Sequence, residues 1–440
     1  MIKILKDKYA ILSVVVFIYF IAISNFQNLY LSLLAILMCL PLMNYPQYLI
    51  PHVLLTSLFG DYFVALPGIG MSRIIGIIFV ISVFILGYKK DRACYIEKNL
   101  FLSAGILSVL SLASCMSSIT GIMIPAYVLI LNFLIMLALS MLSYEELMEG
   151  FFVLRINTII MALNIIFSIV SGSAAYFANR LIFHYSLNSN GLGMAVVQLA
   201  VIIIALMYFK DIQQSNLINI LIVGGCIFII MLTGSRTSLI AILGAITVLF
   251  VYYGFFNKDN RIKIQYILIP VVLIWLVLYA LNHIELEMFT RFTAESVLET
   301  GGSGREEIWK CALENVFPNY PIWGVGLGVE NTIAALSGYG LPNNVGIHNM
   351  YITLLIQVGI VGAVVFLFII CKYTINALRY IRFTNTMFLP ALMLVSAWIN
   401  GIGEEVYAER FVWMAIGMVY VLQKEFMSVE NKKMLKENGQ

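Results

Sequence analysis

Three short segments of the sequence carry side chains suited to binding an anion or moving a proton. The first is Gly-Ser-Arg-Thr at 234–237, where Gly234 interrupts an apolar stretch and Ser235 is placed to cap the next helix. Arg236 then lies in the first helical turn, where the helix dipole disfavours a cation unless an anion joins it. The segment predicts either an anion site or a turn whose arginine head reaches toward water.

The second segment is Gly-Arg-Glu-Glu-Ile-Trp at 304–309, within a long, more polar stretch. Ser303 and Glu306 have the spacing of a capping box, which predicts a helix start and places Arg305 in its first turn. Arg305 is therefore a second candidate for binding an anion. The alternative is that the two neighbouring glutamates neutralise it on a solvated face.

The third segment is His-Asn-Met-Tyr at 348–351, at the start of another apolar stretch. His348 lies near the N-terminus of the predicted helix, whose dipole favours the neutral imidazole that a general base requires. The alternative is a hydrogen-bonded histidine that anchors the end of the helix. The remaining histidines, His52, His184 and His283, have no comparable setting.

The elements that carry these segments are predicted to be membrane helices. The chain has 440 residues, of which 61% are hydrophobic and 11% charged, and its mean hydropathy is +0.95. A water-soluble protein of this size cannot bury so much apolar surface. We expect an all-α polytopic membrane protein with 12–14 transmembrane helices, because prolines in the early stretches leave the number open. The candidate spans lie near 10–25, 28–43, 47–66, 71–88, 99–116, 121–142, 150–171, 190–209, 215–233, 236–256, 263–282, 347–371, 385–402 and 406–423.

The distribution of positive charge predicts how these spans are oriented. Placing the N-terminus in the cytoplasm puts most of the 26 Lys and Arg residues on the cytoplasmic side, as the positive-inside rule requires. The C-terminus then returns to the cytoplasm. The cations left outside are nearly all arginine: Arg73, Arg180, Arg236, Arg291, Arg305 and Arg410, with Lys310. Arginine suits bidentate binding of phosphate or carboxylate, and the alternative is arginine heads that pair with outer glutamates at the interface.

The predicted organisation has five parts. Membrane helices fill 1–187, further membrane helices with the Gly-Ser-Arg-Thr motif fill 188–282, a large extracytoplasmic loop fills 283–346, C-terminal membrane helices fill 347–423, and a cytoplasmic tail fills 424–440. The apolar residues of the helix predicted in the loop, Ile308, Trp309 and Ala312, are expected to rest on the membrane surface. The Gly-rich segment 324–328 is expected to form a tight turn.

Other classes of site are not indicated. The net charge of +3 and the scattered cations do not suggest a nucleic-acid partner. The six cysteines show no CxxC pair, so neither a disulfide framework nor a zinc site is expected. No Asp-x-Asp motif occurs, which disfavours a divalent metal held by paired aspartates.

The order and spacing of four motifs resemble the O-antigen ligase/polymerase superfamily over roughly residues 188–420. The motifs are Gly-Ser-Arg-Thr before a span, Gly-Arg-x-x-x-Trp in a large outer loop, Pro-x-x-Gly-x-Gly at 321–326, and His-Asn-x-Tyr before a span that contains Gly359 and Gly362. The resemblance implies a GT-C-like glycosyltransferase of the bacterial inner membrane that acts on its outer face without metal or other cofactor. Its implied substrate is glycan carried on undecaprenyl pyrophosphate, for O-antigen or capsule synthesis.

Residue roles follow from the same resemblance. Arg236 and Arg305 would hold the pyrophosphate, and His348 would deprotonate the acceptor hydroxyl. Residues expected to bind substrate or support the site are Arg180, Asn349, Trp309, Glu405 and Arg410. In the last outer turn, Glu404, Glu405, Glu409 and Arg410 are expected to bind sugar hydroxyls or orient Arg305, and the alternative is a charge-balanced loop. The implied partners are the lipid bilayer, a chain-length regulator and a flippase.

The sequence leaves two questions open. A polymerase would join lipid-linked repeat units, whereas a ligase would move the glycan to lipid A core or another acceptor. The outer segment with Arg180 favours the polymerase, because polymerases often have two basic outer loops. The rival from another class is a transporter or flippase, which should carry ionisable residues near mid-span, and Arg155 is its best candidate.

Overall fold

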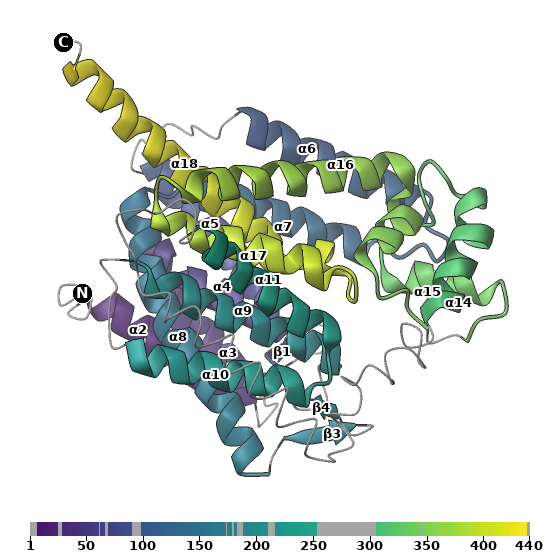
Figure 1. Cartoon of the computed structure of the whole chain (residues 1–440), viewed down its shortest axis with the longest axis horizontal. Coiled ribbons are helices and arrows are strands. Elements are labelled where there is room, and N and C mark those ends of the chain that lie inside the picture. The colour runs from purple at the N-terminus through teal and green to yellow at the C-terminus, as the bar shows by residue number, and fades with distance from the viewer. Residues whose placement is uncertain are drawn as a thin grey trace.

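The protein is an all-α polytopic membrane protein in its computed structural model (Figure 1). The structure describes residues 7–24, 29–60, 62–66, 69–89, 98–172, 174–177, 180–182, 188–209, 216–252, 305–342 and 345–437. The predicted span 263–282, and residues 283–304 of the predicted outer loop with Arg291 and Ser303, lie outside the described residues.

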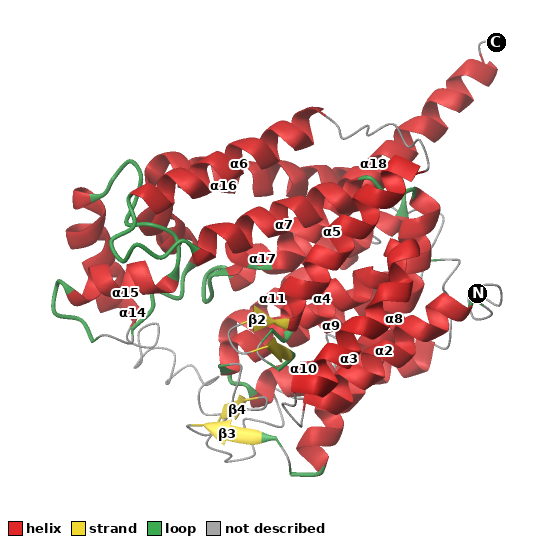
Figure 2. Cartoon of the chain, turned by 180° about the vertical axis from the view of Figure 1, so that it is seen from behind, coloured by secondary structure: helices red, strands yellow, loops and turns green. Residues whose placement is uncertain are grey.

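The first half of the chain consists of helices interrupted by 3₁₀ turns and two hairpins. The helices are α2 (Lys8–Ser24), α3 (Leu29–Cys39), α4 (Ile50–Leu58), α5 (Met71–Lys89), α6 (Lys98–Met116), α7 (Ile124–Ser140), α8 (Tyr144–Val170) and α9 (Ser189–Met207). The 3₁₀ turns are η1 (Leu40–Asn44) and η2 (Pro46–Leu49). The antiparallel hairpins, visible in Figure 2, pair β1 (Val64–Leu66) with β2 (Ile69–Gly70) and β3 (Ala175–Phe177) with β4 (Arg180–Ile182).

The second half begins with α10 (Asn216–Leu232) and α11 (Arg236–Val251). A compact segment follows, with α14 (Arg305–Cys311), the π-helix η7 (Ala312–Val316), η8 (Phe317–Asn319) and α15 (Val329–Ser337). The chain then returns to the bundle through α16 (Met350–Ile381), η9 (Asn385–Met387), α17 (Phe388–Asn400), η10 (Val406–Ala408) and α18 (Arg410–Glu437). A helix satisfies its own backbone hydrogen bonds, so apolar runs of this length adopt it in lipid.

The described helices differ in length from the predicted spans. Those long and apolar enough to cross a membrane are α6, α8, α9 and α16, and shorter apolar helices of 10–17 residues accompany them. The predicted span 28–43 agrees with the apolar helix Tyr30–Asn44, which α3 and η1 form together. The predicted span 47–66 is wrong in extent, because α4 ends at Leu58 and the β1–β2 hairpin follows. Pro41 and Pro46 lie in the first turns of η1 and η2, where each removes a backbone donor.

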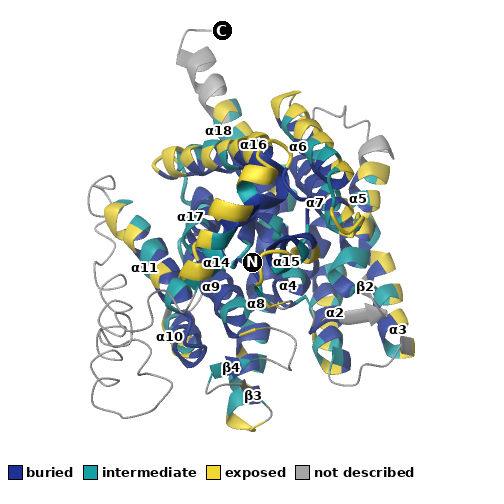
Figure 3. Cartoon of the chain, turned by 90° about the vertical axis from the view of Figure 1, so that its right-hand side faces the viewer, coloured by how far each residue is buried: buried dark blue, intermediate teal, exposed yellow. Residues whose placement is uncertain are grey.

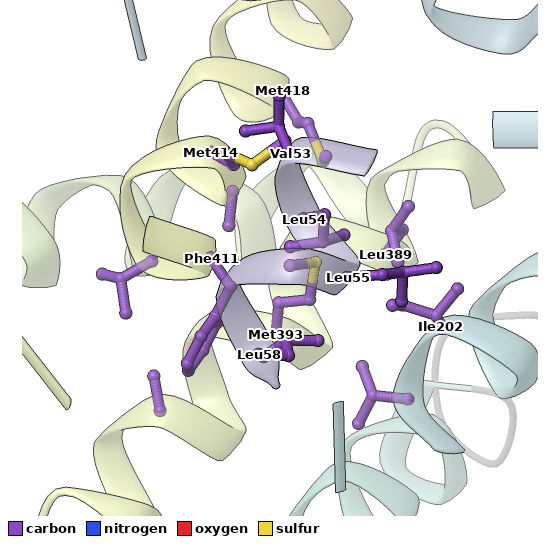
Figure 4. Packing of buried hydrophobic residues seen from close by; sticks show 14 of the residues in the cluster. Val53, Leu54, Leu55, Leu58, Ile202, Leu389, Met393, Phe411, Met414 and Met418 are labelled. Atoms are coloured by element: carbon purple, nitrogen blue, oxygen red, sulfur yellow. The ribbon is translucent and has the colours of Figure 1, made fainter. Parts of the chain in front are cut away.

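The short helix α4 lies in the centre of the bundle. Its 9 residues rise about 14 Å, less than half of a hydrocarbon core of about 30 Å. Val53, Leu54 and Leu55 are fully buried. Figure 4 shows these leucines and valine packed with side chains of α9, α17 and α18, namely Ile202, Leu389, Met393, Phe411, Met414 and Met418. Apolar contacts dominate the interior around α4, and buried His52 of the same helix adds a hydrogen bond with the hydroxyl of Ser13 (2.9 Å).

Turns between helices gather at two ends of the bundle. The helices α14 and α15 lie at the right of Figure 1. Arg305 of α14 donates to Gly403 O in the turn after α17, and Thr120 donates to Asn331 of α15. The helix α2 begins at the left of the figure, and Tyr48 donates to Asp7, the residue before this helix. Segments that the charge distribution assigns to one side of the membrane thus lie at one end. We call them the pocket end (117–123, 171–172, 174–177, 180–182, 188, 233–235, 305–342, 345–349 and 401–409) and the terminal end (7–8, 45–48, 141–149, 381–387 and 423–437).

Residues 305–342 and 345–349 form a cap on the pocket end (Figure 3), with a small core that it shares with α16. The buried members of this core are Ala312, Val316, Val325, Ala335, Leu336, Ile347 and Ile356. Ile308 and Trp309 pack against it. The expectation that these side chains rest on the membrane surface is therefore wrong, because the cap supplies its own apolar contacts.

Candidate active site

His348 lies in the cap segment that leads into α16, and its backbone is left-handed, with φ 47°. It is the one non-glycine residue with a positive φ in the part of the chain that the structure describes. Trp309 Nε1 donates to Ile347 O (2.9 Å), and Arg305 Nη1 donates to His348 O (3.4 Å). Such a backbone costs about 1–3 kcal/mol and persists only where the surroundings impose it. Two predicted site residues therefore fix the backbone of a third.

Asn349 caps the helix that follows. Its Oδ1 accepts hydrogen bonds from the backbone N–H groups of Tyr351 (3.0 Å) and Ile352 (3.2 Å). The N–H of Met350 donates to Gly401 O (2.7 Å). The start of α16 is thus joined to the turn that follows α17, and the amide of Asn349 is used in forming the helix.

The turn between α17 and α18, residues 401–409, is called the acidic loop here, and it contacts two of the predicted motifs. Arg305 Nη1 donates to Gly403 O (3.1 Å). A Cβ at Gly403 would lie 2.7 Å from the side chain of Thr237, so only glycine permits this approach. Arg305 and the first turn of α11, which Arg236 begins, therefore meet at the same residue of the loop.

The Gly-Ser-Arg-Thr turn has the predicted geometry. Gly234 has φ 63°, and Ser235 is the N-cap of α11, with its Oγ accepting from the Ser238 N–H. The hydroxyl of Ser238 in turn donates to Asn400 Oδ1 (3.2 Å), at the end of α17. The prediction that Ser235 caps a new helix at this point is confirmed, and the turn is anchored beside the acidic loop.

Arg180 supports this turn from the β3–β4 hairpin. Its Nε donates to Thr233 O (2.7 Å), and its Nη2 donates to Asn190 Oδ1 (2.5 Å). Thr233 is the residue just before the Gly-Ser-Arg-Thr motif. Arg180 therefore joins α9, the hairpin and the turn that carries Arg236.

A pocket of about 300 Å³ opens next to the acidic loop. It is lined by Met194, Val329, Ile333, Gly346, His348, Glu404, Glu405 and Glu409. His348 Nδ1 lies 3.7 Å from Glu404 Oε2. The pocket therefore brings together a group able to accept a proton, three carboxylates that can accept hydrogen bonds from hydroxyl groups, and an apolar wall.

Burial alters the chemistry of one of these carboxylates. The pKa of Glu405 is raised from 4.5 to about 7, chiefly because burial disfavours its charged form. His348 acts in the opposite direction, and Glu404 adds to the rise. The hydroxyl of Thr353 donates to Glu405 Oε1 (3.3 Å). Near neutral pH the Glu405 carboxyl therefore exists in both protonation states.

Arg410, the remaining predicted supporting residue, points away from the pocket. Its Nε donates to Asn132 Oδ1 of α7 (2.9 Å), and its Nη1 donates to Ser72 O of α5 (2.5 Å). The side chain is buried at 4% exposure. Arg410 therefore joins three helices at the pocket end.

The Gly-rich segment 324–328 completes a break in α16. Gly359 interrupts that helix with φ 66°, which leaves backbone groups without helical partners. The segment satisfies them, since Val325 N–H donates to Ile356 O (2.8 Å) and Gly326 N–H donates to Gln357 O (3.1 Å). A Cβ at Gly359 would overlap the carbonyl of Ile322. The segment is thus more than the predicted tight turn, because it is hydrogen-bonded into a membrane helix.

Sequence reasoning missed the residues that join these parts. Buried Gln357 accepts from Gly328 N–H (3.1 Å) and from the hydroxyl of Tyr407, and it donates to Thr332 (2.9 Å). Asn400 joins the acidic loop to α11. The available signal was a polar amide inside an otherwise apolar span, since such groups require partners in lipid.

The rival interpretation as a transporter rested on Arg155. Its side chain is buried within α8, and Nη2 donates to Asn219 Oδ1 of α10 (2.9 Å).

Within the described residues, no three His, Cys, Asp or Glu side chains are placed to hold a metal ion.

The fold and site define a polytopic helical membrane protein with a histidine-containing pocket at one end of its bundle. Residues 220–367 match a family model described as O-antigen ligase. The match supports the resemblance to the O-antigen ligase/polymerase superfamily that the motifs indicate. No match was found among curated proteins or among solved structures. The matched region contains Arg236, Arg305 and His348, whereas the acidic loop lies beyond it.

Proposed function

We propose that the protein transfers glycan from a polyprenyl-pyrophosphate carrier, undecaprenyl pyrophosphate in bacteria, to a hydroxyl of an acceptor. The observation that carries the proposal is the meeting of Arg305, the first turn of α11 and His348 around the acidic loop. These parts are far apart in sequence and belong to a region of the O-antigen ligase/polymerase superfamily.

The donor would bind through its pyrophosphate to Arg236 and Arg305. Arg236 begins α11, so backbone N–H groups of that helix point toward an anion bound there, and Arg305 would add its guanidinium from α14. The two guanidinium groups would stabilise the charge that develops on the pyrophosphate as it leaves. The polyprenyl chain would remain in the bilayer beside the helices.

The acceptor would enter the pocket next to His348. Its hydroxyl oxygen attacks the anomeric carbon, the bond from that carbon to the pyrophosphate oxygen breaks, and the electron pair stays with the pyrophosphate. The hydroxyl proton passes to the imidazole of His348, and attack opposite the leaving group inverts the anomeric configuration. Carboxylates of the acidic loop would accept hydrogen bonds from other hydroxyls of the acceptor.

We favour a polymerase that joins lipid-linked repeat units on the outer face of the cytoplasmic membrane. The second candidate is a ligase, because the matching family model is described as O-antigen ligase. Arg180, whose outer segment favours the polymerase, also supports the turn before α11 through its hydrogen bonds to Thr233 and Asn190, a role that would serve either enzyme.

Purified protein supplied with undecaprenyl-pyrophosphate-linked repeat units, and no other acceptor, tests the proposal. A polymerase produces a ladder of longer lipid-linked glycans, and His348→Ala lowers the rate by about 10²- to 10⁴-fold. A ligase gives no ladder and transfers glycan only after lipid A core is added. Full activity of His348→Ala would remove His348 as the base, and failure of both reactions would refute the proposed transfer.

A further inference from the structure

His348 and Glu404 face each other at the edge of the pocket. The distance from His348 Nδ1 to Glu404 Oε2 is 3.7 Å. The Glu404 side chain is 12% exposed, whereas that of His348 is 39% exposed. Glu404 Oε1 is buried and has no hydrogen-bond partner among the described residues. The carboxylate is thus mostly withdrawn from water and directs one oxygen toward the imidazole.

Hydrogen bonds to the backbone fix the positions of both His348 and Glu404. Arg305 and Trp309 fix the backbone at His348, as described above. The N–H of Glu404 donates to Asn400 O (3.0 Å), and Asn400 is itself bonded to Ser238 of α11. The cap and the surrounding helices therefore determine that the two side chains face each other. The pair is not a chance contact between flexible surface side chains.

We propose that Glu404 is a positioning residue, which accepts the Nδ1–H of His348 and leaves Nε2 free to take the acceptor's proton. This inference rests on the proposed glycosyl transfer. Gly346, which lines the pocket, is the residue beside Nε2, so this nitrogen lies at the pocket wall. A distance of 3.7 Å exceeds a hydrogen bond, and such pairs commonly tighten when substrate binds.

The charges around His348 make Glu404 the suitable partner. When Nε2 takes the proton, the imidazolium carries a positive charge that the Glu404 carboxylate stabilises. Arg305 lies behind the His348 backbone and supplies a positive charge of its own, which opposes the imidazolium. Glu405 and Glu409 face the same pocket, and Glu330 of α15 acts on Glu405. Of these, Glu405 is engaged by Thr353, and Glu404 is the carboxylate paired with the imidazole.

Steady-state kinetics of Glu404→Gln and Glu404→Ala test the role, with Glu314→Gln, on the exposed face of the cap, as the control. The glutamine keeps an acceptor oxygen without the charge. We expect kcat to fall about 10-fold in Glu404→Gln and about 100-fold in Glu404→Ala, with KM nearly unchanged. The acid limb of the kcat profile should move to lower pH in Glu404→Gln, because the imidazolium has lost its counter-charge. Equal losses in both variants with an unmoved pH profile would indicate a structural role and overturn the proposal.

A second measurement does not depend on activity. Nitrogen-15 spectra of histidine-labelled protein, with the His348 signal identified by its loss in His348→Gln, report which ring nitrogen carries the proton. Wild type should be protonated at Nδ1 and bare at Nε2 at high pH, and Glu404→Ala should be a mixture. The same tautomer in both proteins would overturn the positioning role, even if the glycosyl transfer itself were refuted.

Discussion

The pocket end and the terminal end of the bundle are built differently from similar residue types. At the pocket end, one arginine of the cap reaches two backbone carbonyls on separate segments, those of His348 and Gly403. At the terminal end, Arg382 lies over its sequence neighbour Phe383, with Cζ 4.8 Å from the ring centroid. Arg305 thus joins parts of the chain that are far apart in sequence, whereas Arg382 contacts only the ring of the next residue in this stacking interaction.

This difference indicates where single substitutions should affect function. The pocket end depends on a few directional hydrogen bonds, each with a defined partner, so one changed donor displaces a functional group. The terminal end also has hydrogen bonds between distant segments, such as that from Gln47 Nε2 to Glu149 Oε2 (2.9 Å), but its Arg382 stacks on a sequence neighbour. Residues of the same type at the two ends therefore serve as matched test and control.

The largest expected difference between the ends is their accessibility from outside the cell. In a variant without native cysteines, a cysteine at Tyr339, which is 45% exposed, should react with an impermeant maleimide in intact cells. A cysteine at Glu145, an exposed residue of the terminal end, should react only after the membrane is permeabilised. The reverse pattern would place the pocket in the cytoplasm and contradict the orientation predicted from charge.

The second largest expected difference is the effect of arginine-to-lysine substitutions on the transfer rate. Arg305→Lys and Arg236→Lys keep the charge but lose the planar fork, so we expect each to lower the transfer rate by about 100-fold or more. Arg382→Lys should remain within about 2-fold of wild type. The measurements are initial rates at equal amounts of folded protein in the membrane. Near-normal rates for both pocket-end variants would exclude a bidentate role for these arginines.

A smaller loss is expected for Arg180→Lys. A lysine can reach only one of the two partners, Thr233 O or Asn190, so the turn that carries Arg236 should become less fixed. We expect about a 10-fold lower rate, and a loss for Arg180→Lys combined with Arg236→Lys that is smaller than the product of the two single losses. Independent, multiplying effects would show that Arg180 acts elsewhere.

The smallest expected effect is on how the free energy of unfolding depends on pH. The pKa of Glu405 is about 7 in the folded protein, against 4.5 ordinarily, so the folded state holds a proton that the unfolded chain has lost between these values. Stability therefore falls as pH rises from 4.5 to 7, and the penalty is complete above 7. Thermal unfolding should show Glu405→Gln with a higher Tm than wild type at pH 8 and no gain at pH 5, whereas Glu314→Gln should follow wild type at both.

The fold class could be predicted from the sequence, because composition and apolar runs suffice to define membrane helices. Their lengths could not be predicted where prolines and 3₁₀ turns intervene. The stretch 47–66 is apolar enough for a span, yet its helix ends at Leu58 and a hairpin follows. Hydropathy reports how strongly a segment favours an apolar environment. Burial within the helix bundle provides such an environment as well as lipid does, so an apolar segment need not span the membrane.

The site was partly predictable. The Gly-Ser-Arg motif between two apolar runs predicts the N-cap of α11, because the cap is a hydrogen bond between residues close in sequence. The partnership of His348 with Glu404 was not predictable, because the two residues come from different turns and their meeting depends on how α16 and α17 pack. Arg180 and Arg410 were grouped together by charge, although their hydrogen bonds lie in different parts of the pocket end.

The break in α16 has a consequence for how the protein is assembled in the cell. The freed carbonyl of Gln357 accepts from the hydroxyl of Ser114 in α6 (2.8 Å), and Ile119 N–H donates to Val325 O (3.1 Å). α6 leaves the ribosome long before α16, so its polar end is already in the bilayer when the broken helix arrives. The C-terminal half therefore inserts beside a hydroxyl donor that is already in place. A truncated chain that lacks α6 should lose one hydrogen bond to the Gln357 carbonyl in lipid and keep the one from Gly326 N–H.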